Sequence, residues 1–264
     1  MTPLLLEALA APLLIVQGRR LRKDIPRLPE PDGPRAGETG DGPVMRVLIA
    51  GDSSAAGVGA DHQDHALSGQ FARRLAAAYG VRVRWQLVAA SGLTTREVIA
   101  LLDHAPLEPF DLAVTAVGVN DATERRSPAR WLADVEALVG RLRAHAPQAH
   151  VLLSGLPPVH RFPALPQPLR TYLGARARDL DRALARWSSA RPGTTYVPMP
   201  DMDEPALAAV DGFHPGPGAY AVWAQALVAA LGAVPVARAP GGPTAPAAGA
   251  AASADGAPLF LRSR

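Results

Sequence analysis

Nearly unbroken apolar runs recur along the middle of this chain and predict its strands. Residues 44–50 form a run rich in Val, Leu and Ile that ends abruptly in Gly-Asp-Ser-Ser. Such a run, without alternation, is typical of a strand buried on both faces in the middle of a parallel sheet. Residues 111–118 and 149–155 repeat the pattern, and residues 194–197 predict a shorter strand. Residues 81–89 alternate in part between apolar and polar positions, which predicts a strand at an edge of the sheet.

Between these runs lie stretches with the spacing and the end signals of helices. Gly80 stops the first helix at a C′ position, and Ser127 with Pro128 starts the third as N-cap and first helical residue. The predicted helices cover residues 67–79, 95 to about 103, 128–145, 169–190 and 217–231. Because strands and helices alternate along the chain, we predict one α/β domain with a parallel sheet covered by helices on both faces.

The beginning of the chain differs from the predicted domain. Residues 4–16 are apolar apart from Glu7, and basic residues follow at Arg19, Arg20, Arg22 and Lys23. The apolar part is too short for a comfortable membrane span. It has no basic region before it and no clear cleavage site after it, so we predict no secretory signal and expect a cytoplasmic location. Two interpretations stay open: residues 4–23 lie peripherally on a membrane surface, or they pack on this domain or on a partner protein.

Two further segments flank the predicted domain. Residues 24–43 contain repeated proline and glycine, which is typical of a linker or an extended arm. Residues 233–264 consist largely of alanine, proline and glycine, and we expect them to be disordered. The expected organisation is therefore a leader with its linker over residues 1–43, a domain over residues 44–232, and a tail.

Cysteine content and charge narrow the function classes. Since the chain has no cysteine, disulfides, thiolate metal sites and cysteine nucleophiles are excluded. The net charge is +3, and 24 acidic residues are interspersed among 27 basic ones. The sequence has no long basic run with interleaved aromatic residues, so nucleic acid is not an expected partner.

Four polar stretches each follow a predicted strand or a strand-like segment. They are Gly51-Asp52-Ser53, Ser91-Gly92, Gly118-Val119-Asn120-Asp121 and Asp211-Gly212-Phe213-His214. In a parallel sheet the loops after the strands converge on one edge. We therefore expect these residues, which the sequence scatters, to meet in one cleft.

The residue types in this cleft suit nucleophilic catalysis. A serine hydroxyl needs a base to take its proton, and His214 is the candidate base for Ser53 because imidazole titrates near neutral pH. Asp211 precedes the histidine by three residues in a turn, which lets its carboxylate hold Nδ1–H and leave Nε2 toward the serine. The backbone N–H groups of Ser53 and Gly92 and the side-chain amide of Asn120 are candidate donors to an oxyanion.

The residues of these four polar stretches resemble the conserved segments of a known protein family. The first block reads GDSS, with Ser54 in place of the usual leucine, and the later blocks read SGLTT, GVND and DGFH. In this order and at this spacing, residues 45–231 resemble the SGNH hydrolases, the GDSL-type esterases and lipases. By this resemblance the site residues are the nucleophile Ser53, the oxyanion donors Gly92 and Asn120, and the triad partners Asp211 and His214.

The resemblance also implies a fold and an activity. The fold is a flavodoxin-like three-layer α/β/α sandwich with about five parallel strands. The activity is that of a serine esterase or lipase, which hydrolyses small-molecule or lipid esters through an acyl-enzyme and needs no metal or organic cofactor. We expect the proline-rich loop 156–168 and the loop 60–66 to shape the pocket, although neither reveals the acyl chain or the alcohol.

Other interpretations of the same residues stay open. The main alternative is a non-catalytic binding or scaffold protein that keeps the fold. A nucleotide binder built on the glycine-rich residues 51–59 is disfavoured, because the sequence has neither a P-loop lysine nor a GxGxxG pattern. We expect Asp52 and Asp121 to bond neighbouring loop N–H groups. His62 and His65 have a weak metal-site spacing, and a solvated loop is the preferred interpretation.

Overall fold

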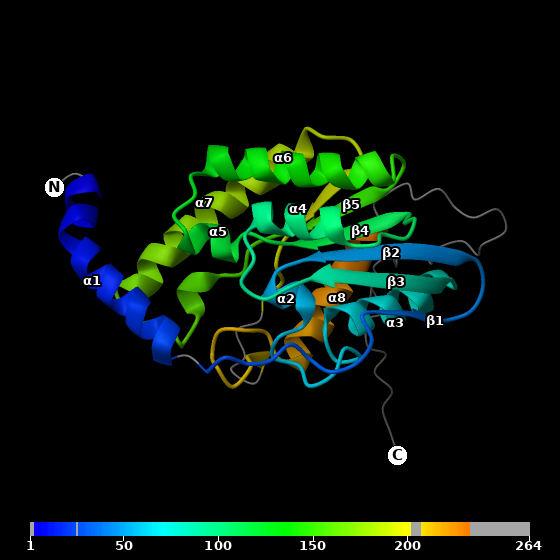
Figure 1. Cartoon of the computed structure of the whole chain (residues 1–264), viewed down its shortest axis with the longest axis horizontal. Helices are drawn as coiled ribbons and strands as arrows, with labels where there is room; N and C mark the ends of the chain where they lie inside the picture. Colours follow the sequence, from blue (N-terminus) through cyan, green and yellow to red (C-terminus); the bar gives the residue numbers. More distant parts are fainter. Residues whose placement is uncertain (1–2, 25, 202–206, 233–264) are drawn as a thin grey trace, which may run out of the picture.

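A six-stranded sheet lies at the centre of the computed structural model, which describes residues 3–24, 26–201 and 207–232 (Figure 1). The strands are β1 (Ala36–Thr39), β2 (Val44–Gly51), β3 (Arg82–Ala89), β4 (Leu112–Ala116), β5 (His150–Ser154) and β6 (Thr194–Val197). Their order is β1-β3-β2-β4-β5-β6, and only the pair β1–β3 is antiparallel. If β1 is left out and the five parallel strands are numbered along the chain, their order across the sheet is 2-1-3-4-5. This is the flavodoxin-like order. The predicted α/β/α fold is confirmed, with one antiparallel strand added.

The added strand β1 corrects two predictions. It lies within residues 24–43, which were predicted as a linker or arm, and it pairs with β3. β3 therefore lies between β1 and β2, and the prediction of an edge strand at residues 81–89 is wrong. The sequence of β1, Ala-Gly-Glu-Thr, has no apolar run, so the strand rests on main-chain pairing and its hydrophobic pattern could not reveal it. Gly37 helps the pairing because a Cβ there would lie 3.2 Å from the indole of Trp85.

Helices cover both faces of the sheet, as predicted (Figure 1). α3 (Leu67–Tyr79) and α8 (Pro217–Leu231) pack together on one face, whereas α4 (Thr95–His104), α6 (Pro128–His145) and α7 (Leu169–Ser189) lie on the other. The predicted end signals are also confirmed. Gly80 ends α3 with φ 60°, and the Ser127 side chain accepts the N–H of Arg130 at the start of α6.

Shorter and peripheral helices complete the described part of the chain. They are α1 (Pro3–Asp24), α2 (Ser53–Ala56), α5 (Val119–Thr123) and the 3₁₀ turn η1 (Val159–Arg161). The one-turn helices α2 and α5, which begin at or just after the carboxyl ends of β2 and β4, were not predicted. α1 covers the apolar and basic leader, and among the described residues no helix is long and apolar enough to cross a membrane. The tail predicted to be disordered, residues 233–264, lies outside the described residues.

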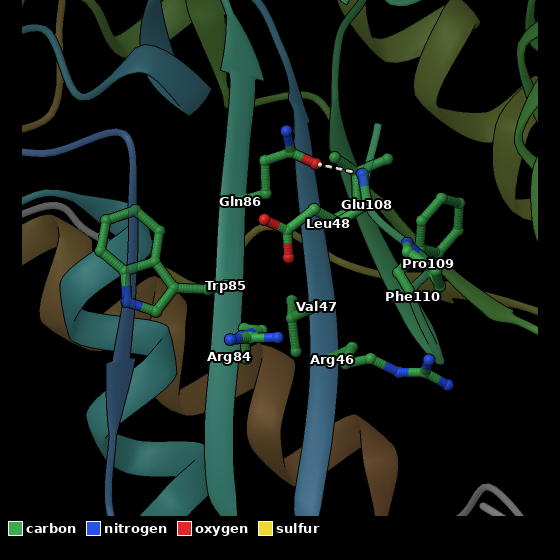
Figure 2. A pocket seen from close by; sticks show the side chains of 9 residues that line it. All are labelled: Arg46, Val47, Leu48, Arg84, Trp85, Gln86, Glu108, Pro109 and Phe110. Carbon is green, nitrogen blue, oxygen red and sulfur yellow. Dashed lines mark hydrogen bonds between the residues drawn. The ribbon is translucent and has the colours of Figure 1, made fainter. Parts of the chain in front are cut away.

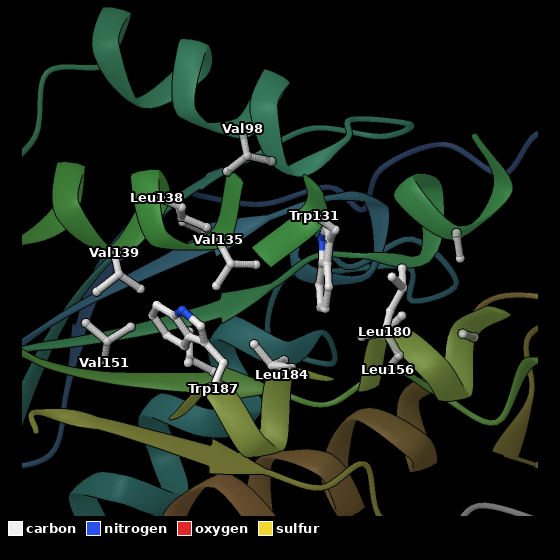
Figure 3. Close-up of a cluster of buried hydrophobic side chains, with 14 of the residues drawn as sticks. Val98, Trp131, Val135, Leu138, Val139, Val151, Leu156, Leu180, Leu184 and Trp187 are labelled. Atoms are coloured by element: carbon white, nitrogen blue, oxygen red, sulfur yellow. The ribbon is translucent and has the colours of Figure 1, made fainter. Parts of the chain in front are cut away.

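Strand side chains alternate between two apolar cores. Val47 and Ile49 of β2 enter the core with α3 and α8, whereas Leu48 and Ala50 enter the core with α4, α6 and α7. Figure 3 shows the second core, in which the fully buried Trp131 from α6 belongs to one cluster with Val151 of β5 and Leu180 of α7. Burial on both faces explains the absence of polar alternation in these strands. It also makes the sheet a firm base for the loops at its carboxyl ends.

Candidate active site

Ser53 is the first residue of α2, directly after the carboxyl end of β2. Asp52 caps this short helix: its Oδ1 accepts the backbone N–H of Ser54 at 3.0 Å and the Ser54 hydroxyl at 2.6 Å. Gly57 ends the helix with φ 97°, and a Cβ at this position would lie 2.5 Å from the Cβ of Ala66. The turn is therefore tight at both ends, and the two serine hydroxyls have different partners.

The loop before α8 brings His214 to Ser53. His214 Nε2 lies 3.0 Å from Ser53 Oγ, although 161 residues separate the two. On the other side of the ring, Nδ1 lies 2.6 Å from Asp211 Oδ2. Asp211 Oδ1 accepts the backbone N–H groups of Phe213 and His214, each at 3.0 Å. The serine, histidine and aspartate that the sequence singled out thus form one hydrogen-bonded chain.

The surroundings of Asp211 favour its charged form. Its side chain is fully buried, and burial acts to raise the pKa of a carboxyl group. The bonds from the His214 ring and from the two backbone N–H groups outweigh burial, so the pKa of Asp211 lies below its ordinary value. A carboxylate at Nδ1 favours the tautomer that carries its proton on Nδ1 and turns the lone pair of Nε2 toward Ser53.

Asp52 is a second buried carboxyl group beside this chain. Burial raises the pKa of Asp52 to about 6, although the bonds from Ser54 and the attraction of His214 act in the opposite direction. The expectation that Asp52 bonds a neighbouring loop N–H is confirmed by its bond to Ser54. The sequence did not show that Asp52 also takes the Ser54 hydroxyl, because GDSS departs from the usual motif at that residue.

The candidate oxyanion donors come from two further loops. Asn120 lies in α5, and its Nδ2 donates to the carbonyl of Leu93 at 2.9 Å. Gly92 precedes Leu93, is exposed, and has φ 82°, a left-handed conformation that favours glycine. Ser53, Asn120 and His214 line the same pocket, whereas Gly92 lies on the adjoining loop and does not line it.

Asp121 ties these two loops together. Its Oδ2 accepts the backbone N–H of Thr95 at 3.0 Å and the Thr95 hydroxyl at 2.8 Å. Thr95 Oγ1 in turn accepts the indole N–H of Trp131 at 2.9 Å. Burial raises the pKa of Asp121. The expectation that Asp121 bonds a loop N–H is confirmed. The sequence did not show that this bond joins the segment of Gly92 to the segment of Asn120. The one feature of the sequence that pointed to it is the position of Asp121 directly after Asn120.

A pocket of about 400 Å³ opens at Ser53 and His214. The loop after β5, the segment before α8 and α8 itself contribute its mainly apolar wall, which includes Pro157, Pro158, Phe162, Pro163, Met199, Leu207, Val210, Phe213 and Trp223. The expectation that loop 156–168 shapes the pocket is confirmed. The same expectation for loop 60–66 is wrong, because none of these residues, all of them described, lines the pocket.

The histidines of loop 60–66 make local pairs. His62 Nδ1 lies 3.2 Å from Asp64 Oδ2, and His65 Nδ1 lies 2.7 Å from Asp61 Oδ1. All four side chains are well exposed. The described residues contain no group of three or more His, Cys, Asp or Glu side chains that could hold a metal ion. This arrangement agrees with the solvated-loop interpretation.

A second and much smaller pocket lies toward the amino ends of the strands. Figure 2 shows this pocket, of about 10 Å³, between β2, β3 and the segment before β4. Gln86 Oε1 accepts the backbone N–H of Glu108 there at 3.1 Å. Its lining residues include no serine and no histidine. The groups suited to nucleophilic chemistry therefore lie at the carboxyl edge of the sheet.

Comparisons with known proteins show the family to which this chain belongs. A flavodoxin-like sandwich whose carboxyl edge holds a serine bonded to a histidine–aspartate pair has the organisation of a serine hydrolase. Residues 49–222 match the GDSL-like lipase/acylhydrolase family. GDSL-like esterase Rv1075c of Mycobacterium tuberculosis is 32% identical over 245 residues, which cover 83% of this chain and 76% of that protein. The chain belongs to the GDSL-like lipase/acylhydrolase family and is a carboxylic ester hydrolase.

Solved structures of similar fold include two lipases. Lipase Lip_vut3 from a goat rumen metagenome aligns with a TM-score of 0.58 at 18% identity, over 70% of this chain and 97% of its own. An extracellular lipase from Streptomyces rimosus aligns with a TM-score of 0.52 at 19% identity, over 70% of this chain and 99% of its own. At such identities the likeness shows the fold alone.

Proposed function

We propose that this protein hydrolyses carboxylic esters through an acyl-enzyme formed on Ser53, with His214 and Asp211 as the other members of a catalytic triad. The observation that carries the proposal is the distance of 3.0 Å between Ser53 Oγ and His214 Nε2. At this distance the imidazole takes the hydroxyl proton as the oxygen attacks the ester. The 2.6 Å contact between Asp211 and His214 supports the same roles, because the carboxylate stabilises the imidazolium.

The reaction has two halves. Ser53 Oγ bonds to the carbonyl carbon, its proton passes to His214 Nε2, and the carbonyl oxygen becomes an oxyanion. The bond to the alcohol oxygen then breaks, and the departing alcohol takes the proton from His214. Water attacks the acyl-enzyme in the second half, giving a proton to His214 that returns to Ser53 Oγ as the carboxylic acid leaves.

Donors for the oxyanion are the N–H groups of Ser53 and Gly92 and the side-chain amide of Asn120. An amide nitrogen has two N–H bonds. The Leu93 carbonyl takes one of those of Asn120, so the other is free to point at the substrate oxygen. The bond to Leu93 also holds the amide in place before substrate arrives, and such preorganisation makes a donor effective in the transition state.

Replacing Asn120 with alanine tests the role of its amide. We expect the Asn120→Ala variant to lower kcat by about 10²–10³-fold with little change in KM, because the amide bonds the charge that develops in the transition state. Steady-state kinetics with a soluble aryl ester measures both constants, and thermal unfolding checks that the lost bond to Leu93 leaves the fold intact. A raised KM with an unchanged kcat contradicts an oxyanion role.

The pocket supports an ester with an apolar part as substrate. Apolar and aromatic side chains predominate in its wall, and the rings of Phe162 and Phe213 pack edge to face with centroids 5.1 Å apart. Such a wall favours an acyl chain or an apolar alcohol over a charged group. The relative Rv1075c is described as an esterase and the two similar structures as lipases, which supports a small-molecule or lipid ester.

Labelling with a fluorophosphonate tests the nucleophile directly. We expect the probe to modify one serine, and mass-spectrometric mapping to place the label on Ser53, because among the serines that the structure describes its hydroxyl alone bonds to the His214 ring. Ser54 is an internal control: it lies next in the chain and lines the same pocket, but its hydroxyl bonds to Asp52. A label on Ser54, or no label on folded protein, contradicts the proposal and favours a non-catalytic protein with this fold.

A further inference from the structure

Helix α1 is attached to the domain along one side. Leu14 is buried at 5% exposure in the core that contains α7, and Leu21 packs against the same core. The side chain of Gln17 donates from Nε2 to the carbonyl of Gln167 at 2.7 Å and accepts the N–H of Leu169 at its Oε1 at 3.2 Å. Two apolar contacts and two hydrogen bonds therefore orient the helix on the start of α7.

The exposed surface of α1 carries a group of apolar side chains followed by a group of basic ones. Leu13, Ile15 and Val16 are exposed at 49%, 46% and 46%, which is unusual for large apolar residues of one segment. About one turn farther along the helix, the side chains of Arg19, Arg20 and Lys23 are exposed, and none forms an ion pair with a described residue. At 100° per residue, Ile15, Val16, Arg19 and Lys23 lie on the side opposite Leu14 and Gln17.

Helix α1 lies at the same end of the molecule as the proposed catalytic pocket. In Figure 1, α1 projects from the end of the molecule to which the carboxyl ends of the parallel strands point. Gln167, which Gln17 bonds, belongs to the loop whose earlier residues line the pocket. Val210 also lines the pocket, and this residue, which precedes Asp211, is 92% exposed. An exposed apolar residue thus lies at the pocket itself.

We infer that α1 docks the protein on an anionic lipid bilayer. Its exposed apolar residues enter the boundary between headgroups and acyl chains, and its exposed cations bind anionic headgroups. Three exposed cations, which have no ion-pair partner in the described part of the chain, lie next to three exposed apolar side chains and complement the layers of such a bilayer. A second copy of α1 would instead oppose like charges. The docking is independent of the proposed chemistry, whereas its consequence, that the ester is drawn from the bilayer, rests on the proposed function.

Vesicle sedimentation with the full chain tests this docking. Ser53→Ala protein is mixed with phosphatidylcholine vesicles that do or do not contain phosphatidylglycerol. We expect binding to the anionic vesicles, weakened by salt. Loss of the three exposed cations alone weakens it by roughly a hundredfold, since each cation near an anionic surface contributes about a factor of five, and their replacement by anions weakens it further. The test variant is Arg19→Glu/Arg20→Glu/Lys23→Glu, and a second variant, Ile15→Asp/Val16→Asp, removes the apolar part.

A matched control separates docking from net charge. It makes the same charge change at three exposed arginines at or toward the amino ends of the strands, Arg82→Glu/Arg182→Glu/Arg186→Glu. We expect this control to bind anionic vesicles as the parent protein does. Equal loss of binding in test and control variants overturns the inference, as does unchanged binding of the α1 variants or failure of the parent to bind. A dimer that the α1 variants dissociate, without vesicle binding, assigns the surface to a second copy instead.

Activity measurements keep this inference distinct from the proposed function. With Ser53 intact, the α1 variants should hydrolyse a soluble aryl ester at the parent rate, because no substituted residue lines the pocket. They should lose activity only toward an ester embedded in anionic vesicles. Parent protein that cleaves the soluble ester but does not bind vesicles overturns the docking alone. Parent protein that binds vesicles but cleaves neither ester overturns the proposed chemistry alone.

Discussion

Ser53→Ala is expected to lower kcat for a soluble aryl ester by a factor on the order of 10⁶, which removes measurable turnover. Ser53 Oγ is the atom 3.0 Å from the candidate base, and alanine leaves His214 nothing to activate. The matched control is Ser54→Ala, for which we expect a change of tenfold or less. Ser54 bonds to Asp52 through both its hydroxyl and its backbone N–H, and alanine keeps the backbone bond.

Two outcomes contradict this assignment. Full activity in Ser53→Ala shows that another residue attacks the ester. A larger loss in Ser54→Ala than in Ser53→Ala exchanges the roles of the two serines. Thermal unfolding of both variants shows whether a loss of activity is a loss of fold, and each variant removes only one hydroxyl group near the surface of the pocket.

The pattern of apolar and polar residues predicted most of the sheet but not its antiparallel edge. β2, β4 and β5 are buried on both faces, so their runs of Val, Leu and Ile were recognisable without any partner. β1 is half exposed, contains Gly37 and Glu38, and depends on main-chain bonds to β3. Hydrogen bonds of this kind leave no hydrophobic pattern, which is why the sequence predicts a linker or an extended arm over residues 24–43 and an edge strand over residues 81–89.

For the site, the sequence identified single residues better than the connections between them. Ser53, Asp211 and His214 could be named because each ends a strand or lies in a polar turn, and a parallel sheet brings such turns to one edge. The bonds from Asp121 to Thr95 and from Asn120 to Leu93 depend on how α5 is placed against the loop after β3. No local pattern encodes that placement, so the bonds that hold the proposed oxyanion donors in place could be recognised only in the folded structure.

Asp211→Asn is expected to lower kcat at pH 7 by about 10⁴-fold while Ser53 and His214 stay in place. An asparagine can turn its N–H₂ group toward Nδ1, which favours the tautomer with a proton on Nε2, and that nitrogen then cannot accept the serine proton. The amide also lacks the charge that stabilises the imidazolium. Steady-state kinetics with a soluble aryl ester measures the loss, and a loss below about tenfold contradicts the role of Asp211 in the triad.

The pH dependence of unfolding supplies a second readout for the same substitution. The pKa of Asp211 is lowered in the folded protein, so its contribution to stability is present above the ordinary carboxyl pKa and is lost as the pH falls through the folded value. Asp52 has the opposite sign, because burial raises its pKa to about 6 and its contribution falls as the pH rises toward that value. Asp52 is present in both proteins, so its contribution cancels in the difference between their unfolding free energies. We expect denaturant unfolding to show a stability deficit of Asp211→Asn at pH 7 that shrinks below pH 4, and a deficit that is constant with pH contradicts a bonded carboxylate.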